Sequence, residues 1–250
     1  IDPRGPKPKL SKSELLTIMV YYALHLFTNF KAFYRYFCTY ENHHFAEIAS
    51  YQRVIASLPN QFKTFVYMLS RLLNCQHRFK YVDSSHLRVC HIKRERHHKA
   101  FPQAAKFKTT MCWFKGFKLH LAIDGRGNIC GIDLTPAHHA DINSIDKLTK
   151  HITGKVYGDK GYISQEKKQT LLKKGIELIT SSKRNMKQAI ISDENALFLR
   201  KRSLIETVFA QLKNKAALKL NLARSWIHGI IRMIAAIIAY QLQPRKPAIR

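Results

Sequence analysis

Residues 79–83 read FKYVD, a short apolar run that ends in a carboxylate, and residues 155–159 repeat this pattern as KVYGD. Short runs of this kind, rich in aromatic and β-branched residues, are typical of strands. We expect the two strands to pair side by side and to point the same way. Asp83 and Asp159, each directly after its strand, would then meet at one edge of a sheet, where ligands bind in open α/β folds. Two carboxylates so placed repel each other unless a cation lies between them.

The rest of this half of the chain alternates strands with helices. Further strands are predicted at residues 116–123, 129–135 and 177–180, and the turn at residues 124–128 joins the first two as a hairpin. Helices are predicted at residues 142–150, 165–174, 198–215 and 227–240. Three strands followed by strands reached through helices predict an α/β fold, with a mixed five-stranded sheet flanked by helices.

The first part of the chain has a different texture. Ser11 to Glu14 form a capping-box pattern that predicts a helix to about Phe27. Further helices are predicted at residues 31–40, 51–58 and 61–73, with the last two separated at Pro59 and Asn60. The aromatic residues between positions 27 and 40 are interpreted as core. We therefore predict two domains, an all-helical N-terminal domain at residues 1–77 and the α/β domain at residues 78–250.

Charge narrows the class of partner. The 250 residues include 43 Lys and Arg but only 16 Asp and Glu, a formal net charge of +27. A polyanion is therefore the expected partner, with nucleic acid the first candidate and an anionic membrane surface or a ribosomal context the alternatives. The five cysteines form no CxxC pair, which argues against a disulfide framework or a structural zinc site and favours a reducing cytoplasm. The apolar run at residues 227–240 is short for a membrane span and is predicted to be a buried helix.

A third carboxylate lies in the predicted helix at residues 198–215. Arg202, Glu206 and Lys213 are spaced by four and then seven residues, so they share one helix face. An exposed, salt-bridged face is the alternative interpretation. Three carboxylates in so basic a chain indicate metal-dependent chemistry on a phosphodiester backbone. The rival carboxylates are Asp124, Asp133 and Asp141, of which Asp133 is the strongest rival.

Two basic clusters are candidates for contacts with a nucleic-acid backbone. The connection between the first two predicted strands is too long for a simple hairpin loop and carries a single acid. We interpret it as a DNA-backbone clamp, with a solvated basic loop as the alternative. Its cations are Arg88, Lys93, Arg94, Arg96, Lys99, Lys106 and Lys108. The second cluster, at residues 183–187, follows the last predicted strand. Residues 51–73 are the best candidate for a helix-turn-helix that reads DNA.

The motifs together resemble a known family. They are YVDS at residues 81–84, GFKLHL at 116–121, LTP at 134–136, GDKGY at 158–162 and KR-IETV between 201 and 208. In this order they resemble the DDE transposases of bacterial insertion sequences, most closely the insertion-sequence 982 family, over nearly the whole chain. Related families carry Tyr-x2-Arg-x3-Glu-x6-Lys on the glutamate helix. Arg202, Glu206 and Lys213 match this signature, whereas Leu199 stands at the tyrosine position.

The resemblance implies an RNase H-like catalytic domain with Asp83, Asp159 and Glu206 as its catalytic triad. These residues would bind two divalent ions, Mg²⁺ or Mn²⁺, and would cleave DNA at the ends of the element and join those ends to target DNA. The residues expected to bind DNA are Arg202, Lys213, Arg88, Lys93, Arg94, Arg96, Lys99, Lys183, Arg184 and Lys160.

The same resemblance implies a homodimer or a larger assembly on double-stranded DNA, in the cytoplasm of a bacterium, associated with the nucleoid and with no membrane partner. Two alternatives stay open. One is an RNase H-like nuclease that cuts without joining. The other is an inactive DNA-binding remnant of a transposase, either decayed or truncated, for which the start at Ile1 rather than Met is an argument.

Overall fold

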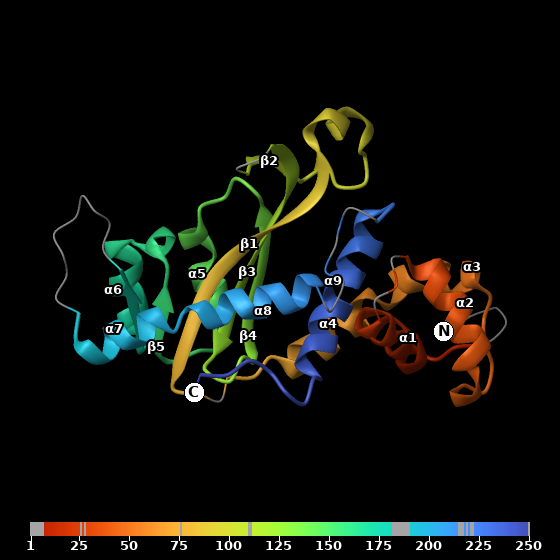
Figure 1. The fold of residues 1–250 in the computed structure, drawn as a ribbon, viewed down its shortest axis with the longest axis horizontal. Coiled ribbons are helices and arrows are strands. Elements are labelled where there is room, and N and C mark those ends of the chain that lie inside the picture. Colours follow the sequence, from red (N-terminus) through yellow and green to blue (C-terminus); the bar gives the residue numbers. More distant parts are fainter. Residues whose placement is uncertain are drawn as a thin grey trace, which may run out of the picture.

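A computed structural model describes residues 8–25, 27, 29–75, 77–109, 112–181, 191–214, 218, 220 and 223–249. Within these residues, a group of N-terminal helices lies beside a mixed β-sheet that is flanked by helices on both faces (Figure 1). The predicted fold class is therefore confirmed. No helix in this described part of the chain is long and apolar enough to span a membrane.

The N-terminal helices begin where the sequence predicts. Helix α1 (Lys12–Leu24) starts at a capping box, in which Glu14 N–H donates to Ser11 Oγ at 3.2 Å and Ser11 N–H donates to the Glu14 carboxylate at 2.7 Å. Helix α2 (Phe30–Tyr40) follows. Helices α3 (Tyr51–Ser57) and α4 (Phe62–Leu72) are separated by the 3-10 turn η2 (Leu58–Gln61), which contains the predicted break at Pro59.

Four aromatic side chains of α2 form the core of this region, as predicted, whereas Tyr40 at its end is 63% exposed and was wrongly assigned to the core. Phe30, Phe33, Tyr34 and Phe37 are each at most 3% exposed. Their rings contact one another at centroid distances of 5.8 to 6.0 Å. Aromatic burial of this kind supplies a large part of the stability of a small helical unit.

Within the described residues the sheet has six strands, one more than predicted, in the order β2-β3-β1-β5-β6, with β4 also paired to β3. The strands are β1 (Phe79–His91), β2 (Ala105–Lys108), β3 (Trp113–Asp124), β4 (Ile129–Pro136), β5 (Gly154–Gly158) and β6 (Ile176–Thr180). The predicted hairpin is β3–β4, and the predicted parallel pair is β1–β5. The additional strand, β2, lies in the long basic connection that was interpreted as a DNA-backbone clamp and for which no strand was predicted.

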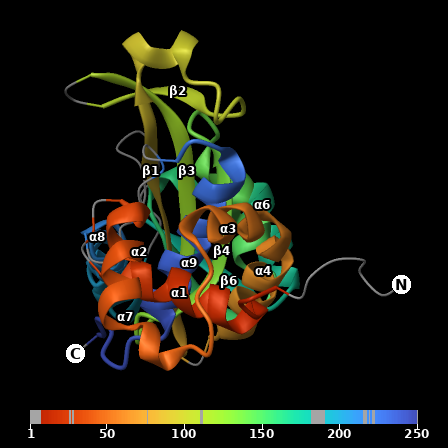
Figure 2. The same ribbon diagram turned by 90° about the vertical axis from the view of Figure 1, so that its right-hand side faces the viewer.

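Strand β1 is much longer than predicted. It continues through Asp83 to His91 because β3 supplies an antiparallel partner along this whole length, with an irregularity between Arg88 and Cys90. The outer parts of β1 and β3, together with β2 and the 3-10 helix η3 (Ile92–His97), project beyond the rest of the sheet (Figures 1 and 2). We call residues 88–116 the arm.

Different helices cover the two faces of the sheet. Helices α5 (Ile145–Leu148) and α6 (Gln165–Lys173) lie on one face, and α7 (Asp193–Arg200) and α8 (Ser203–Asn214) lie on the other (Figure 1). The single helix predicted at residues 198–215 is thus wrong. The turn at Lys201 and Arg202 divides it, because α7 packs on β5 and β6 whereas α8 crosses β1.

Helix α9 (Trp226–Gln241) is buried, as predicted for residues 227–240. It packs against α1 and α4 and also against α8, so it joins the N-terminal helices to the helices of the sheet. Its Tyr240 hydroxyl donates to Gly127 O in the β3–β4 turn at 2.7 Å. Gln241 Nε2, at the end of α9, donates hydrogen bonds to Leu72 O at the end of α4 and to Ile129 O in β4. These contacts fix the helical region against the sheet.

Candidate active site

Strand β1 presents alternate side chains to the two faces of the sheet. Tyr81 belongs to the core beneath α8, with Ile205, whereas Val82 belongs to the core beneath α6, with Leu171. Asp83 therefore lies on the α8 face. Asp83 was expected to follow the end of its strand. It lies within the strand instead, because β1 continues along β3.

The parallel pairing of β1 with β5 nevertheless ends at this point. The last pair is Val82 with Gly158. Asp83 follows Val82 within β1, and Asp159 directly follows the end of β5. Asp159 precedes the 3-10 turn η5 (Lys160–Tyr162) and is exposed. Asp83 and Asp159 therefore lie at the same end of the β1–β5 pairing, although β1 itself continues, with Asp83 partly buried and Asp159 exposed to solvent.

Asp83 lies in a strongly charged environment. Its Oδ1 accepts from Ser84 N–H at 2.8 Å, and its Oδ2 accepts from Arg202 Nη1 at 2.9 Å. Burial raises the pKa of the Asp83 carboxyl above its ordinary value. The Ser84 N–H and the Arg202 guanidinium lower this pKa, while the nearby carboxylates of Asp159 and Asp141 raise it. Asp83 is thus a carboxylate that a further cation would stabilise.

Glu206 is connected to Asp83 through one guanidinium. It lies in the first turn of α8, and its Oε1 is 3.5 Å from Arg202 Nη2. Arg202 itself lies in the turn before α8 and not within the helix as predicted. Its two terminal nitrogens contact two different carboxylates, so positive charge already occupies the space between Asp83 and Glu206.

Lys213 lies about two turns beyond Glu206 along α8. Its Nζ is 2.5 Å from Ser85 Oγ, on the same face of β1 as Asp83. Burial lowers the pKa of Lys213, and the charge of Arg88 lowers it further. Asp83, Ser85, Glu206 and Lys213 line one pocket of about 380 Å³. The predicted face of the α8 helix is thus directed at the sheet carboxylate and is not simply solvated.

Among the rival carboxylates, Asp141 and not the higher-ranked Asp133 contacts the neighbour of Asp83. Asp133 pairs with the exposed Lys147 at 3.1 Å, and Asp124 accepts bonds within its own turn. Asp141 instead lies next to the site, where its Oδ1 accepts from Ser84 Oγ at 2.8 Å and from Lys118 Nζ at 3.0 Å. Asp141 follows β4 by five residues and reaches Ser84 from the face of the sheet opposite α8.

Two buried residues complete the surroundings of Asp141. His120 pairs in register with Ser84, and its Nε2 is 2.8 Å from Thr135 Oγ1. Its Nδ1 is 3.8 Å from Asp141 Oδ1, and burial lowers the pKa of His120 to about 4. Tyr162 is fully buried, and burial followed by the charges of Asp141, Asp83 and Asp159 raises its pKa. His120 is therefore neutral at neutral pH.

The predicted DNA-binding residues lie in three places. Lys160 is exposed directly after Asp159, and Arg202 and Lys213 line the α8 face described above. The arm carries the exposed Arg88, Lys93, Arg94, Arg96 and Lys99. Lys183 and Arg184 lie outside the described residues.

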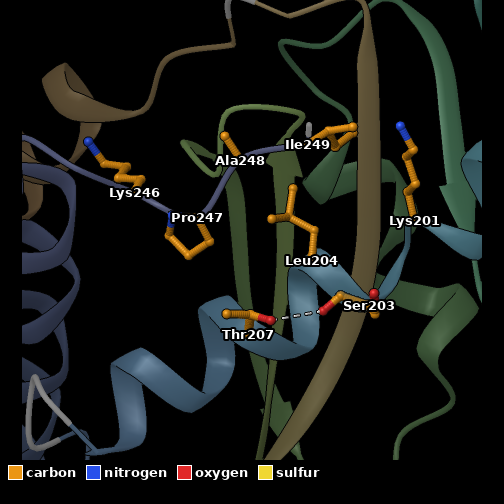
Figure 3. A pocket seen from close by; sticks show the side chains of 8 residues that line it. All are labelled: Lys201, Ser203, Leu204, Thr207, Lys246, Pro247, Ala248 and Ile249. Atoms are coloured by element: carbon orange, nitrogen blue, oxygen red, sulfur yellow. Dashed lines mark hydrogen bonds between the residues drawn. The ribbon is translucent and has the colours of Figure 1, made fainter.

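Two other features lie apart from the carboxylates. A pocket of about 520 Å³ opens beside the α7–α8 turn, where Lys201, Leu204 and Thr207 face the C-terminal residues 246–249, and no carboxylate lines it (Figure 3). After α2, ligand atoms of Glu41, His43 and His44 lie within 4.8 Å of one another. Neither feature involves a residue of the predicted site.

Comparisons with known proteins agree on one class. The model of a family described as "Transposase DDE domain" matches residues 74–226, which is more than half of the chain. A piggyBac transposase synaptic complex with hairpin DNA is similar in structure, with a TM-score of 0.52 and 9% sequence identity over 93% of this chain and 61% of that chain. The chain thus spans less than two thirds of that transposase. A Mos1 strand transfer complex matches with a TM-score of 0.29 and 14% identity, over 97% of this chain and 81% of that chain. No curated protein matches the sequence.

Proposed function

Because the chain belongs to the transposase DDE domain family, we propose that it cleaves DNA at the ends of an insertion sequence and transfers the freed strands into target DNA. Asp83, Asp159 and Glu206 are the catalytic carboxylates in this proposal. The observation that carries it is the Arg202 guanidinium, which contacts Asp83 at 2.9 Å and Glu206 at 3.5 Å. A cation between these two carboxylates marks the place where positive charge is favoured.

The carboxylates fit divalent metal ions. Carboxylate oxygens are the ligands that Mg²⁺ and Mn²⁺ prefer, and the pKa of Asp83 is raised by burial and by neighbouring carboxylates, which a bound cation would offset. Asp83, Asp159 and Glu206 would hold two such ions. When bound, the ions supply activation of the attacking oxygen and stabilisation of the leaving oxygen.

The cations of α8 have a separate role. Arg202 and Lys213 flank Glu206 and can hold phosphate oxygens without exchanging protons. Burial and Arg88 lower the pKa of Lys213, but its hydrogen bond to Ser85 keeps the ammonium directed into the pocket. Lys160, next to Asp159, can contact the same phosphodiester from the other side.

Double-stranded DNA, both element end and target, is the proposed partner. The net charge of +27 and the exposed cations of the arm support binding to its backbone. Lys183 and Arg184 are included on sequence grounds alone, and residues 51–73 are proposed to read the element end. We further propose a homodimer or a larger assembly, because two ends must be joined. The similar piggyBac transposase structure is a synaptic complex. A cytoplasmic, nucleoid-associated protein of a bacterium, nearest to the insertion-sequence 982 family, is the proposed context.

The deciding experiment is cleavage of DNA that carries the element's terminal repeats, with Mg²⁺ or Mn²⁺, by wild type and by Glu206→Gln. The variant keeps the shape of the side chain and removes its charge. We expect metal-dependent nicking at the repeat boundary by wild type and a loss of at least about a hundredfold in the variant. Asp133→Asn, whose carboxylate pairs with Lys147 away from the site, is the matched control.

Other results would point to the alternatives. Nicking that survives in Glu206→Gln would remove Glu206 from the triad. Cleavage of any DNA without joining would favour a nuclease, and binding without cleavage under either metal would favour an inactive remnant.

A further inference from the structure

The end of the arm holds a tryptophan in a fixed position. Trp113 is the first residue of β3 and pairs with Lys108, the last residue of β2. Just beyond this pair, Thr109 and Cys112 are joined by hydrogen bonds, in which Thr109 N–H donates to Cys112 O at 3.0 Å and Cys112 N–H donates to Thr109 Oγ1 at 3.2 Å. Trp113 therefore belongs to the hydrogen-bonded ribbon of β2 and β3, and this ribbon is part of the arm that projects beyond the rest of the sheet (Figures 1 and 2).

Trp113 differs from the neighbouring aromatic residues of the arm. Phe107 is 6% exposed and stacks on His86 with a centroid distance of 4.4 Å. Phe114 lies beneath the Arg88 guanidinium, whose carbon is 4.2 Å from the ring centroid. Trp113, by contrast, is 48% exposed. The arm thus has its own aromatic packing, and the indole lies outside it. Single exposed apolar side chains are common on protein surfaces, so the surroundings of this one decide its meaning.

Those surroundings are cationic. Residues 88–116 contain one acid, Glu95, and its carboxylate is already paired with Lys106 at 3.1 Å and Lys115 at 3.9 Å. Lys108, directly opposite Trp113, is exposed. An aromatic platform beside backbone-binding cations is the combination that binds the bases of unpaired nucleic acid strands. A second copy of this chain would bring an arm of the same charge, which argues against a contact between arms.

We propose that Trp113 stacks on an unpaired base of the DNA that the arm holds, so that the preferred substrate contains a frayed or single-stranded segment near the cleavage point. The identity of the nucleic acid as DNA rests on the proposed function. The distance from Trp113 to Asp83 can be taken from strand geometry, because Leu121 is the β3 partner of Asp83. Eight residues of β3 separate Leu121 from Trp113, at most roughly 27 Å or about eight base steps.

The chain offers a direct probe, since it has only two tryptophans. Trp226→Phe, at the exposed first residue of α9, leaves Trp113 as the sole indole. The fluorescence of Trp113 in this variant would be followed while a 20-nucleotide oligo(dT) strand or a fully paired 20-base-pair duplex is added. EDTA would be present so that no metal-dependent cleavage takes place. We expect the single strand to quench the emission and the paired duplex to change it little.

Affinities for the two probes separate stacking from charge. In Trp113→Ala we expect affinity for oligo(dT) to fall roughly 5- to 150-fold and affinity for the duplex to stay within about twofold. Trp113→Phe should restore most of the loss, because it keeps an aromatic face. Lys108→Gln is the matched control. It should weaken binding to both probes and reduce the salt dependence of binding.

Three results would overturn the inference. The first is an equal loss for both probes in Trp113→Ala, and the second is unchanged Trp113 emission at saturating oligo(dT). The third is a change in the sedimentation of the DNA-free protein on Trp113→Ala, which would make Trp113 a contact between copies. Metal-dependent nicking is measured separately. Absence of nicking with intact quenching would refute the proposed cleavage and leave the stacking inference standing.

Discussion

The Ser84 hydroxyl donates to Asp141 Oδ1 at 2.8 Å, although 57 residues separate the two in sequence. Ser84 follows Asp83 on β1, and its N–H also donates to Asp83 Oδ1. One residue therefore connects the carboxylate on the α8 face of the sheet to Asp141 on the opposite face. Asp141 is thus a positioning residue for the neighbourhood of Asp83.

Replacement of Asp141 tests this connection. In Asp141→Ala, the Lys118 ammonium, whose side chain is 13% exposed, loses its carboxylate partner. We expect a loss of about 1.5 to 3 kcal/mol in the free energy of unfolding, measured with urea, because a charged, partly buried hydrogen bond is removed. Asp133→Ala breaks a pair with Lys147, whose side chain is 69% exposed, and should cost less than about 1 kcal/mol. Equal losses would contradict a special role for Asp141.

Arg202 is predicted to compete with divalent ions. Its guanidinium contacts both Asp83 and Glu206, so an ion held by these carboxylates must displace it. In Arg202→Gln we expect Mn²⁺ to bind roughly tenfold more tightly by calorimetry or electron paramagnetic resonance, while DNA cleavage falls. Arg200→Gln, at the exposed end of α7, is the matched control. Weaker Mn²⁺ binding in Arg202→Gln would mean that the guanidinium supports the metal site.

His120 is predicted to make stability dependent on pH. Its pKa is lowered to about 4 in the folded chain by burial, from an ordinary value of 6.5. Between these pH values the unfolded chain binds more protons than the folded chain. The contribution of neutral His120 to the stability of the fold is therefore complete above pH 6.5 and is lost as the pH falls toward 4. This effect amounts to about 2 kcal/mol between pH 7.5 and 5.0.

The measurement is urea unfolding of wild type and His120→Gln at both pH values, with the exposed His151→Gln as the control. We expect the pH dependence to shrink by that amount in His120→Gln only. An unchanged pH dependence would show that the pKa of His120 is not lowered in the folded chain.

Tyr240 is predicted to stabilise the contact between α9 and the sheet. In Tyr240→Phe, the buried Gly127 carbonyl loses the hydroxyl that donates to it at 2.7 Å. An unsatisfied buried acceptor should lower the free energy of unfolding by about 1 to 2 kcal/mol. Tyr67→Phe, at a side chain 67% exposed, should change it by less than about 0.5 kcal/mol. A similar effect of both substitutions would argue that the Tyr240 bond contributes nothing.

The helices and strands that could be predicted from the sequence are those marked by a short run of neighbouring residues. Apolar runs ending at Val82 and Gly158 indicated the parallel pair, and the capping box at Ser11 located the start of α1. The continuation of β1 was not predicted, because the polar segment SSH at residues 84–86 interrupts the apolar pattern before Leu87 and Val89 resume the alternation of a strand. Pairing with β3 makes this segment part of the strand.

Parts of the candidate site were missed for the same reason. Asp141 reaches Ser84 through the return of β4 alongside β3, and no spacing in the sequence encodes that contact. Arg202 was expected within one long helix, whereas α7 and α8 pack on different strands and leave it in the turn between them. The sequence did identify Asp83, Glu206 and Lys213, because each lies in a strand or helix whose apolar residues recur with a clear period.

The irregularity in β1 between Arg88 and Cys90 has a consequence for how such chains can diverge. A slip of one residue in β1 would exchange Asp83 with Ser84 across the sheet. The irregularity lies between Asp83 and most of the arm, so an inserted or deleted residue in the arm can be absorbed there without turning Asp83 away from α8. Evolution can therefore change the length of the arm independently of the carboxylate that β1 carries, Asp83.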